Sequence, residues 1–187
     1  MLTIVHFDCT PSPLGGMVLA SNGDALTGAW FAGQRHQPPI GPGWERRPGL
    51  PVLRRAAVQL AAYFAGELIA FDVPLAPVGT PFQRDVWRAI SGVPCGATIA
   101  YRELAQRAGR PASIRAAGAA TGRNPLSIFI PCHRIVGADG TLTGYAGGLA
   151  RKRALLALER VALERVAGAA TPTPRAAPVD ALADAFI

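Results

Sequence analysis

The sequence lacks any long run of apolar residues, and it contains only three cysteines in 187 residues. No segment approaches the roughly 20 apolar residues that a membrane-spanning helix needs. The N-terminus has no basic stretch followed by an apolar core, which a secretory signal would show. Cys9, Cys95 and Cys132 are odd in number and irregularly spaced, so they do not form a disulfide framework. These absences favour a cytoplasmic protein with free thiols and no membrane partner.

Nucleotide-binding signatures and paired metal ligands are also missing. There is no phosphate-binding loop and no G-x-G-x-x-G fingerprint, so nucleotide hydrolysis is unsupported. The three cysteines and three histidines are scattered, so we expect no metal site. Half of the residues are hydrophobic, which is enough for a packed core, and the net charge is +7. That charge favours a polyanion such as nucleic acid as partner, although an arginine-rich composition can also arise by drift.

The first part of the chain predicts a small α/β domain. Asn22-Gly23 suits a tight hairpin turn between two strands. No residue pattern in this part points to chemistry. The predicted elements, in chain order, are strands at 2–7, 17–20 and 25–31, a Gly- and Pro-rich loop at 37–51, a helix at 52–65 and a strand at 71–75.

The character of the chain changes at Thr80. Thr80 can cap a helix, Pro81 suits its first turn, and Gln83 can reach back as in a capping box, with Gly92 at the far end. A domain boundary is therefore expected here. The predicted division is an α/β domain at 1–78, a mainly helical domain at 79–168, and a flexible Ala- and Pro-rich tail at 169–187.

The helical part contains a helix-turn-helix pattern. Predicted helices at 101–108 and 112–121 are joined by Gly109-Arg110-Pro111. Five arginines and one glutamate lie from residue 102 to residue 123. The second helix consists almost entirely of small residues, which suits either tight packing inside the protein or close approach to a DNA groove. The arginines favour DNA.

Apolar residues surround the adjacent Cys132 and His133. A buried thiol is normally inert, but a nearby imidazole can take its proton and leave a nucleophilic thiolate. The predicted helix at 151–166 places Glu159 in the middle of an apolar face, where a carboxylate needs a partner and could orient that imidazole. Taken alone, the Cys-His pair favours a packed core cysteine, the scattered cysteines and histidines argue against a metal ligand, and the nucleophile of a thiol hydrolase stays open.

The wider set of motifs resembles the O6-alkylguanine-DNA alkyltransferase (methylated-DNA–protein-cysteine methyltransferase) family from about residue 80 to residue 166. These motifs are Asn124-Pro125, Pro131-Cys132-His133-Arg134, Gly144-Tyr145-Ala146-Gly147-Gly148-Leu149, and Glu159. The resemblance implies a ribonuclease-H-like α/β domain followed by a mainly α domain with a helix-turn-helix. It implies DNA repair by single-use transfer of a methyl or alkyl group from O6 of guanine, with O4 of thymine as a second candidate. No cofactor is implied, because the protein itself is the acceptor.

The resemblance also implies roles for individual residues. Cys132 would accept the alkyl group, His133 would act as its base through a water, and Glu159 would orient His133. Asn124 would order the cysteine segment, and Tyr101 would donate to N3 of guanine. The flipped base would contact Tyr145, Ala146, Ile135 and Ser127, and DNA would contact Arg115, Ala116, Ala117, Thr121 and Arg123.

The implied partner is duplex DNA carrying O6-alkylguanine, bound by a monomer that could also assemble cooperatively along DNA. Arg115 would fill the gap left by the flipped nucleotide, with its small-residue helix in a minor groove about 6 Å wide. We expect His133→Ala and Glu159→Gln to lower thiol reactivity while leaving the fold largely intact. The departures from the usual family pattern are Cys95, Ala97, Ser127 and Ala146.

Two other functions remain open at this level. One is a non-catalytic protein that binds alkylated DNA, which the presence of Cys132 argues against. The other is a helix-turn-helix regulator, which would prefer one operator sequence.

Overall fold

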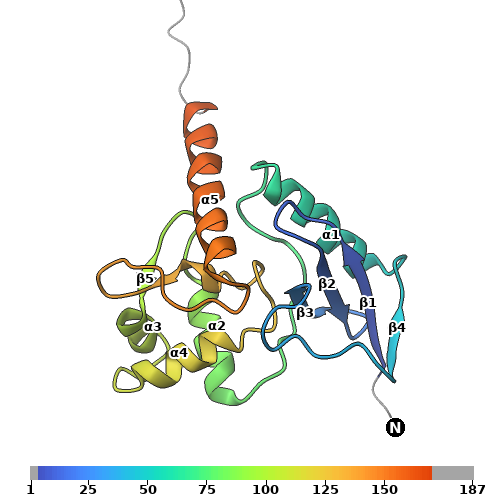
Figure 1. Cartoon of the computed structure of the whole chain (residues 1–187), viewed down its shortest axis with the longest axis horizontal. Coiled ribbons are helices and arrows are strands. Elements are labelled where there is room, and N and C mark those ends of the chain that lie inside the picture. Colours follow the sequence, from blue (N-terminus) through green and yellow to red (C-terminus); the bar gives the residue numbers. More distant parts are fainter. Residues whose placement is uncertain (1–3, 170–187) are drawn as a thin grey trace, which may run out of the picture.

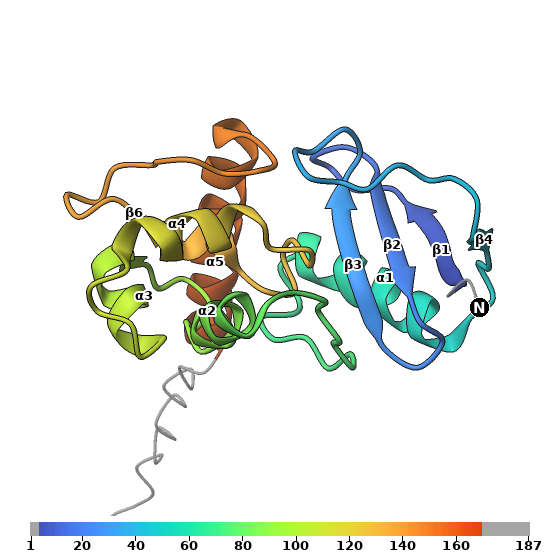
Figure 2. The ribbon, with the colours of Figure 1, turned by 90° about the horizontal axis from the view of Figure 1, so that it is seen from below.

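The structure, a computed structural model, describes residues 4–169. The predicted flexible tail lies outside these residues, except for its first position. Along the chain, a sheet and one helix come first, and a group of helices follows (Figure 1). The two parts lie side by side, with the sheet in one and the helix-turn-helix in the other (Figure 2).

A mixed four-stranded sheet forms the first part, with strand order β3-β2-β1-β4. Strand β2 (Met17–Ser21) pairs antiparallel with both β1 (Val5–Thr10) and β3 (Leu26–Phe31). The predicted α/β class is therefore confirmed. Strand β4 (Trp44–Arg46) pairs parallel with β1 inside the segment predicted to be only a loop, so that prediction was wrong over these three residues.

The strand predicted at 71–75 is wrong. Only Leu75 forms an isolated bridge, with Leu26. The Leu26 amide donates to the Pro74 carbonyl at 2.8 Å, and the Ala76 amide donates to the Leu26 carbonyl at 2.8 Å. Proline has no amide hydrogen, so Pro74 itself cannot donate to a ladder.

Helix α1 (Pro51–Phe64) runs across one face of this sheet, as its predicted amphipathic spacing requires (Figures 1 and 2). The helix begins with a proline at its first position, where no amide hydrogen is needed. The buried side of α1 ends at Tyr63, which is 2% exposed and points toward the second part of the chain.

Helix α2 (Pro81–Ser91) has the predicted capping box. The Gln83 amide donates to Thr80 Oγ1 at 3.2 Å, and the Thr80 amide donates to Gln83 Oε1 at 2.9 Å. The helix ends at Gly92, as predicted.

The helix-turn-helix consists of α3 (Tyr101–Arg107) and α4 (Ile114–Gly122), joined by a turn in which Gly109 has φ of 71°. Helix α4 begins two residues later than predicted. The Trp87 indole donates to the Ala120 carbonyl at 2.9 Å and so fixes α4 against α2.

Helix α5 (Leu149–Ala169) is longer than predicted at both ends, and its C-terminal half projects beyond the rest of the structure (Figure 1). For that reason Val166, predicted on the buried face, is 51% exposed. Leu155 and Glu159 are fully buried, so the predicted inward direction of Glu159 is confirmed. No helix within residues 4–169 is long and apolar enough to cross a membrane.

One hydrophobic core extends through both parts of the chain. The Phe71 and Phe129 rings lie 4.6 Å apart between centroids. The Ala29 amide in β3 donates to the Pro125 carbonyl at 2.8 Å, and the Ser127 amide returns a bond to the Ala29 carbonyl at 2.9 Å. The segment that leads to Cys132 therefore rests on the edge of the sheet.

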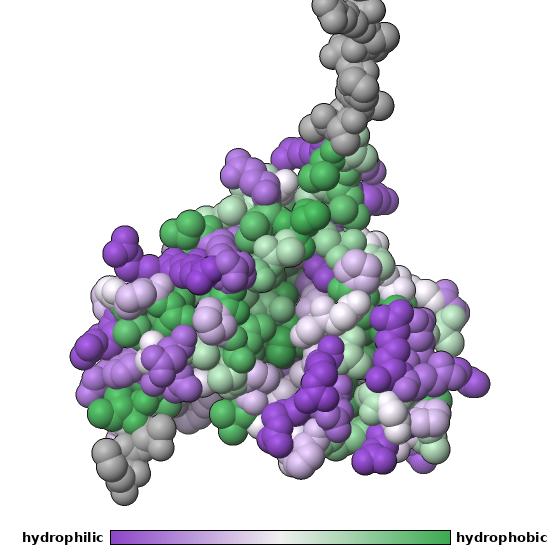
Figure 3. Space-filling model, turned by 180° about the vertical axis from the view of Figure 1, so that it is seen from behind, coloured by the Kyte–Doolittle hydropathy of each residue, from purple (hydrophilic) through white to green (hydrophobic). Residues whose placement is uncertain are grey.

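On the opposite face of the molecule, apolar residues gather along and below α5 and are flanked by polar ones (Figure 3).

Candidate active site

Cys132 begins a single 3-10 turn, η1 (Cys132–Arg134), which leads into strand β6 (Ile135–Val136). Strand β6 pairs in parallel with β5 (Ile99–Ala100), and α3 starts at the next residue, Tyr101. The thiol is almost buried, with Cys132 4% exposed. Just upstream, Ile128 has φ of 74°, a conformation that costs a β-branched residue about 1–3 kcal/mol and that only the surrounding packing can enforce.

Asn124 ties the end of the helix-turn-helix to this turn. Its side-chain Oδ1 accepts from the Leu126 amide at 3.0 Å, while Nδ2 donates to the Ile130 carbonyl at 2.8 Å. The same Nδ2 lies 3.1 Å from Cys132 Sγ. An amide donor at this distance stabilises the thiolate form of the cysteine.

Glu159 is the centre of a buried hydrogen-bond cluster. Its Oε1 lies 2.8 Å from His133 Nε2 and 2.7 Å from Arg134 Nη2, and it accepts from the Tyr63 hydroxyl at 2.9 Å. Its Oε2 accepts from Arg134 Nε at 3.0 Å and from the Gly96 amide at 3.1 Å. A buried carboxylate requires a partner, and Glu159 has four partner residues from three segments: Tyr63, Gly96, and the adjacent His133 and Arg134.

These contacts set the charge state of the pair. Burial alone would raise the pKa of Glu159, but the hydrogen bonds from His133 and Arg134 outweigh it and hold that pKa well below its usual range. Burial lowers the pKa of His133, and Arg134 adds to this. A carboxylate can only accept, so the neutral imidazole carries its proton on Nε2. Its Nδ1 is then an acceptor, and it is buried without a hydrogen-bond partner.

The resting thiol of Cys132 is neutral. Burial raises its pKa to about 11, although Asn124 and the nearby Lys152 act in the opposite direction. Lys152 lies on α5 and is itself fully buried. Its Nζ donates to the carbonyls of Ile135 at 2.5 Å and Thr143 at 2.7 Å, and burial lowers its pKa to about 8.

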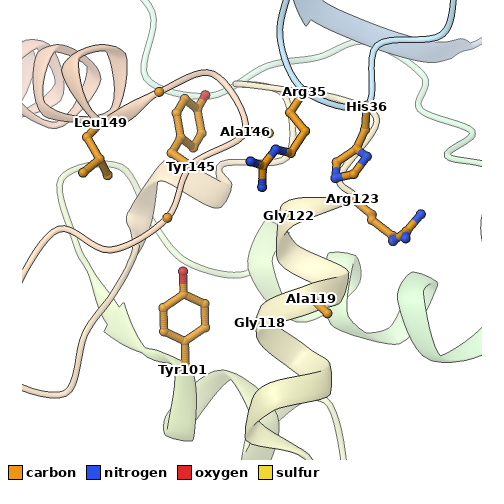
Figure 4. A pocket seen from close by; sticks show the side chains of 12 residues that line it. Arg35, His36, Tyr101, Gly118, Ala119, Gly122, Arg123, Tyr145, Ala146 and Leu149 are labelled. Atoms are coloured by element: carbon orange, nitrogen blue, oxygen red, sulfur yellow. The ribbon is translucent and has the colours of Figure 1, made fainter.

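A cavity of about 710 Å³ lies between the helix-turn-helix and the loop after β6. Figure 4 shows Tyr101 and Tyr145 on one side of the cavity and α4 on the other, with Arg35 and His36 near its upper edge. The part of the wall that α4 and its last turn supply is small or basic, namely Gly118, Ala119, Gly122 and Arg123. Cys132 does not line the cavity itself, but it lies close enough to Tyr145 that a negative charge on its sulfur would raise the pKa of that phenol beyond the effect of burial.

The structure brings some of the predicted site residues together and separates others. Tyr101, Tyr145, Ala146 and Arg123 line the cavity. Ile135, predicted to contact the base through its backbone, and Ser127 are 0% and 1% exposed and are not among the residues that line the cavity, so their contact with the base stays a prediction. Ser127 Oγ donates to Gln34 Oε1 at 3.0 Å.

The predicted DNA-binding residues of α4 also divide into two groups. Arg115 and Ala116 are exposed on the outer side of the helix. Ala117 and Thr121 are 0% and 5% exposed, and the Thr121 hydroxyl donates to the Ala117 carbonyl at 2.8 Å. Their side chains pack inside the protein, because α4 presents only one of its faces to the outside.

Several site residues were missed from sequence. Arg134 was read only as part of a motif, although it binds Glu159 through two nitrogens. Lys152 lies on the same face of α5 as Glu159, seven residues earlier, and that spacing was the available signal. Tyr63 and Arg35 belong to the first part of the chain, where nothing in the sequence signals proximity to Cys132.

Among residues 4–169, no group of three His, Cys, Asp or Glu side chains could hold a metal ion.

Comparison with known proteins gives matches over both parts of the chain. The model of the 6-O-methylguanine DNA methyltransferase ribonuclease-like domain matches residues 5–77, and that of the DNA-binding domain of the same enzymes matches residues 81–161. Methylated-DNA--protein-cysteine methyltransferases of Mycobacterium tuberculosis and Haemophilus influenzae are 46% and 41% identical over 84% and 86% of this chain, covering 93% and 89% of their own.

Two solved structures are similar to this chain in both sequence and fold. The crystal structure of the Mycobacterium tuberculosis O6-methylguanine methyltransferase is 46% identical with a TM-score of 0.77, and that of Mycobacterium tuberculosis OGT in complex with DNA is 45% identical with a TM-score of 0.78. Each covers 84% of this chain and 94% of the other.

Proposed function

The chain belongs to the O6-methylguanine DNA methyltransferase family, and from that premise we propose that Cys132 is the cysteine that accepts the alkyl group. The protein is a methylated-DNA–protein-cysteine methyltransferase, an enzyme that repairs DNA by transferring an alkyl group to one of its own cysteines. The observation that supports Cys132 is its position beside the buried cluster of His133 and Glu159, with Asn124 on its sulfur. The alternative of a non-catalytic lesion binder is not supported, since the relatives are methyltransferases.

The chemistry is a displacement in which the sulfur replaces oxygen on the alkyl carbon. The thiol proton leaves for His133 Nδ1, directly or through a water, because Nε2 is held by Glu159. The sulfur then attacks the alkyl carbon, the bond from that carbon to O6 breaks, and its electrons return to the guanine. Tyr101 on the cavity wall is placed to donate a proton or hydrogen bond to the leaving base. The product is a thioether, so each molecule acts once.

A buried sulfur cannot meet a base that is stacked in a duplex. Turning the nucleotide out costs a few kcal/mol, least for a badly paired lesion. The cavity bounded by Tyr101, Tyr145 and Ala146 is the proposed receptor for that base. The exposed side of α4, with Arg115 and Ala116, is proposed to enter the minor groove, where Arg115 fills the vacated gap.

Basic residues outside the helix-turn-helix extend this surface. Arg35 and His36 follow β3 and lie on the same cavity as Arg123 (Figure 4). The Arg35 amide also donates to the Ala146 carbonyl at 3.2 Å. We expect these basic residues to bind phosphates, with little sequence preference and a strong dependence on salt. We also propose that the two domains divide between residues 78 and 79 and that the protein acts as a monomer in the cytoplasm. Activity on O4-alkylthymine is part of the same proposal.

The test is loss of O6-methylguanine from a duplex, measured with three single variants of the three cysteines. We expect Cys132→Ala to leave the lesion intact, whereas Cys9→Ala and Cys95→Ala remove one methyl group per protein molecule. Full repair by Cys132→Ala, or repair of many lesions per molecule by the wild type, would contradict the proposal.

A further inference from the structure

Arg151 lies where the wall of the cavity meets the first part of the chain, and the mechanism above gives it no role. It occupies the first turn of α5, and its side chain is partly buried. Its Cζ atom lies 4.7 Å from the centroid of the Phe31 ring, at the end of β3. Phe31 is 0% exposed, so the guanidinium is stacked on the hydrophobic core of the first part of the chain.

Two nitrogens of this guanidinium bond two different segments. Nε donates to the Leu14 carbonyl at 2.8 Å, in the loop between β1 and β2. Nη1 donates to the Gly147 carbonyl at 3.0 Å, in the loop after β6 that carries Tyr145 and Ala146 on the cavity wall. One planar group with a fixed arrangement of donors therefore joins the first part of the chain to the loop that bounds the cavity.

The loop from residue 144 to residue 148 forms only a turn, so its position depends on contacts of this kind. The Arg35 amide donates to the Ala146 carbonyl at 3.2 Å, again from the first part of the chain (Figure 4). At Gly147, an added Cβ atom would lie 3.2 Å from the Phe31 ring, so the loop backbone already lies close to that ring. Phe31 therefore supports both the guanidinium and the loop to which the guanidinium bonds.

We propose that Arg151 is a positioning residue, which holds the loop from Tyr145 to Gly147 against the first part of the chain and so keeps the cavity in the shape that receives the base. The inference rests on the proposed function of that cavity. A displaced wall would weaken binding of the base but leave His133 and Glu159 in place beside the thiol, so the expected defect is in binding rather than in reaction. The first part of the chain, in which no residue pattern points to chemistry, thereby contributes to recognition of the base.

The test compares Arg151→Met with Arg153→Met. Both remove one positive charge from the same end of α5, but Arg153 is exposed. The rate of alkyl transfer is measured over a range of concentrations of free O6-benzylguanine, at a temperature where circular dichroism shows each variant to be folded. Two quantities are obtained for each variant: the concentration of base that gives half of the maximal rate, and the maximal rate itself.

We expect Arg151→Met to raise the half-saturating concentration by roughly tenfold, because it removes hydrogen bonds from a charged donor, and to change the maximal rate by less than about twofold. Arg153→Met should change neither quantity. Arg151→Lys keeps the charge but has one nitrogen in place of the two that bond Leu14 and Gly147, so its half-saturating concentration should lie between those of the wild type and Arg151→Met.

Arg151→Lys also decides the question if Arg151→Met does not fold. A folded Arg151 variant with the wild-type half-saturating concentration overturns the proposal, and so does one whose defect lies in the maximal rate alone. Failure of the wild type to transfer benzyl would instead contradict the proposed function.

Discussion

The hydrogen bond from Tyr63 to Glu159 predicts that one substitution lowers the stability of the protein without changing the rate of alkyl transfer. Tyr63 comes from α1 in the first part of the chain, and its hydroxyl donates to the Glu159 carboxylate at 2.9 Å in a fully buried position. Burial, followed by the charge of Glu159, raises the pKa of Tyr63 far above its usual value, so the hydroxyl remains a donor at any working pH. Tyr63→Phe removes this donor and leaves the ring in place.

The size of the effect follows from the bond. A buried hydrogen bond to a charged group contributes about 1.5–3 kcal/mol. With a urea m-value of about 2 kcal/mol/M, the midpoint of unfolding should fall by about 1 M. Alkyl transfer from free O6-benzylguanine should change little, because Glu159 retains His133, Arg134 and the Gly96 amide.

Tyr145→Phe is the matched control for stability. The Tyr145 hydroxyl is also buried, but the polar group beside it is the neutral Ser127 side chain, and it bonds no charged group within the described residues. Its removal should therefore change the free energy of unfolding by less than about 0.5 kcal/mol. Equal shifts of the urea midpoint in Tyr63→Phe and Tyr145→Phe would show that the Tyr63 hydroxyl does not support the carboxylate.

Three further predictions concern reactivity, DNA and the buried charges. Since burial raises the pKa of Cys132 to about 11, its labelling rate with iodoacetamide should keep rising with pH from 7 to 10, and a plateau below pH 9 would contradict a neutral resting thiol. Arg115→Ala should slow repair of duplex DNA far more than transfer from the free benzylated base, because only the duplex requires flipping; equal losses would exclude the finger role. Glu159→Gln leaves Arg134 buried without its anion, so we expect calorimetry to show a loss of about 3 kcal/mol or more in the free energy of unfolding. Alkyl transfer should also become slower. An unchanged melting temperature would argue against the ion pair.

That last prediction revises the expectation from sequence that Glu159→Gln leaves the fold largely intact. Helical periodicity correctly placed Glu159 inward, but it could reveal only that the carboxylate needs a partner. The partners come from residues 63, 96, 133 and 134, and contacts over such separations depend on how the segments pack. Local patterns carry no information on that packing.

The difference between local patterns and the packing of distant segments also explains which elements of the fold could be predicted. The capping box at Thr80 was predictable because all of its atoms lie within four residues. Strand β4 was not, since three residues in a Gly- and Pro-rich segment become a strand only by pairing with β1. Likewise, the residues of α4 are nearly all small, so the sequence does not distinguish its buried face from its exposed face. In the structure α4 packs against α2, and Ala117 is buried while Ala116 is exposed.

The proposed function depends above all on Cys132 as the residue that receives the alkyl group. The most direct measurement is peptide mass spectrometry of the wild-type protein after reaction with duplex DNA whose O6-methylguanine carries a deuterated methyl group. We expect one labelled methyl on the Cys132 peptide, none on the peptides of Cys9 or Cys95, and an equal amount of restored guanine. Restored guanine with an unlabelled Cys132 peptide would contradict the proposed function.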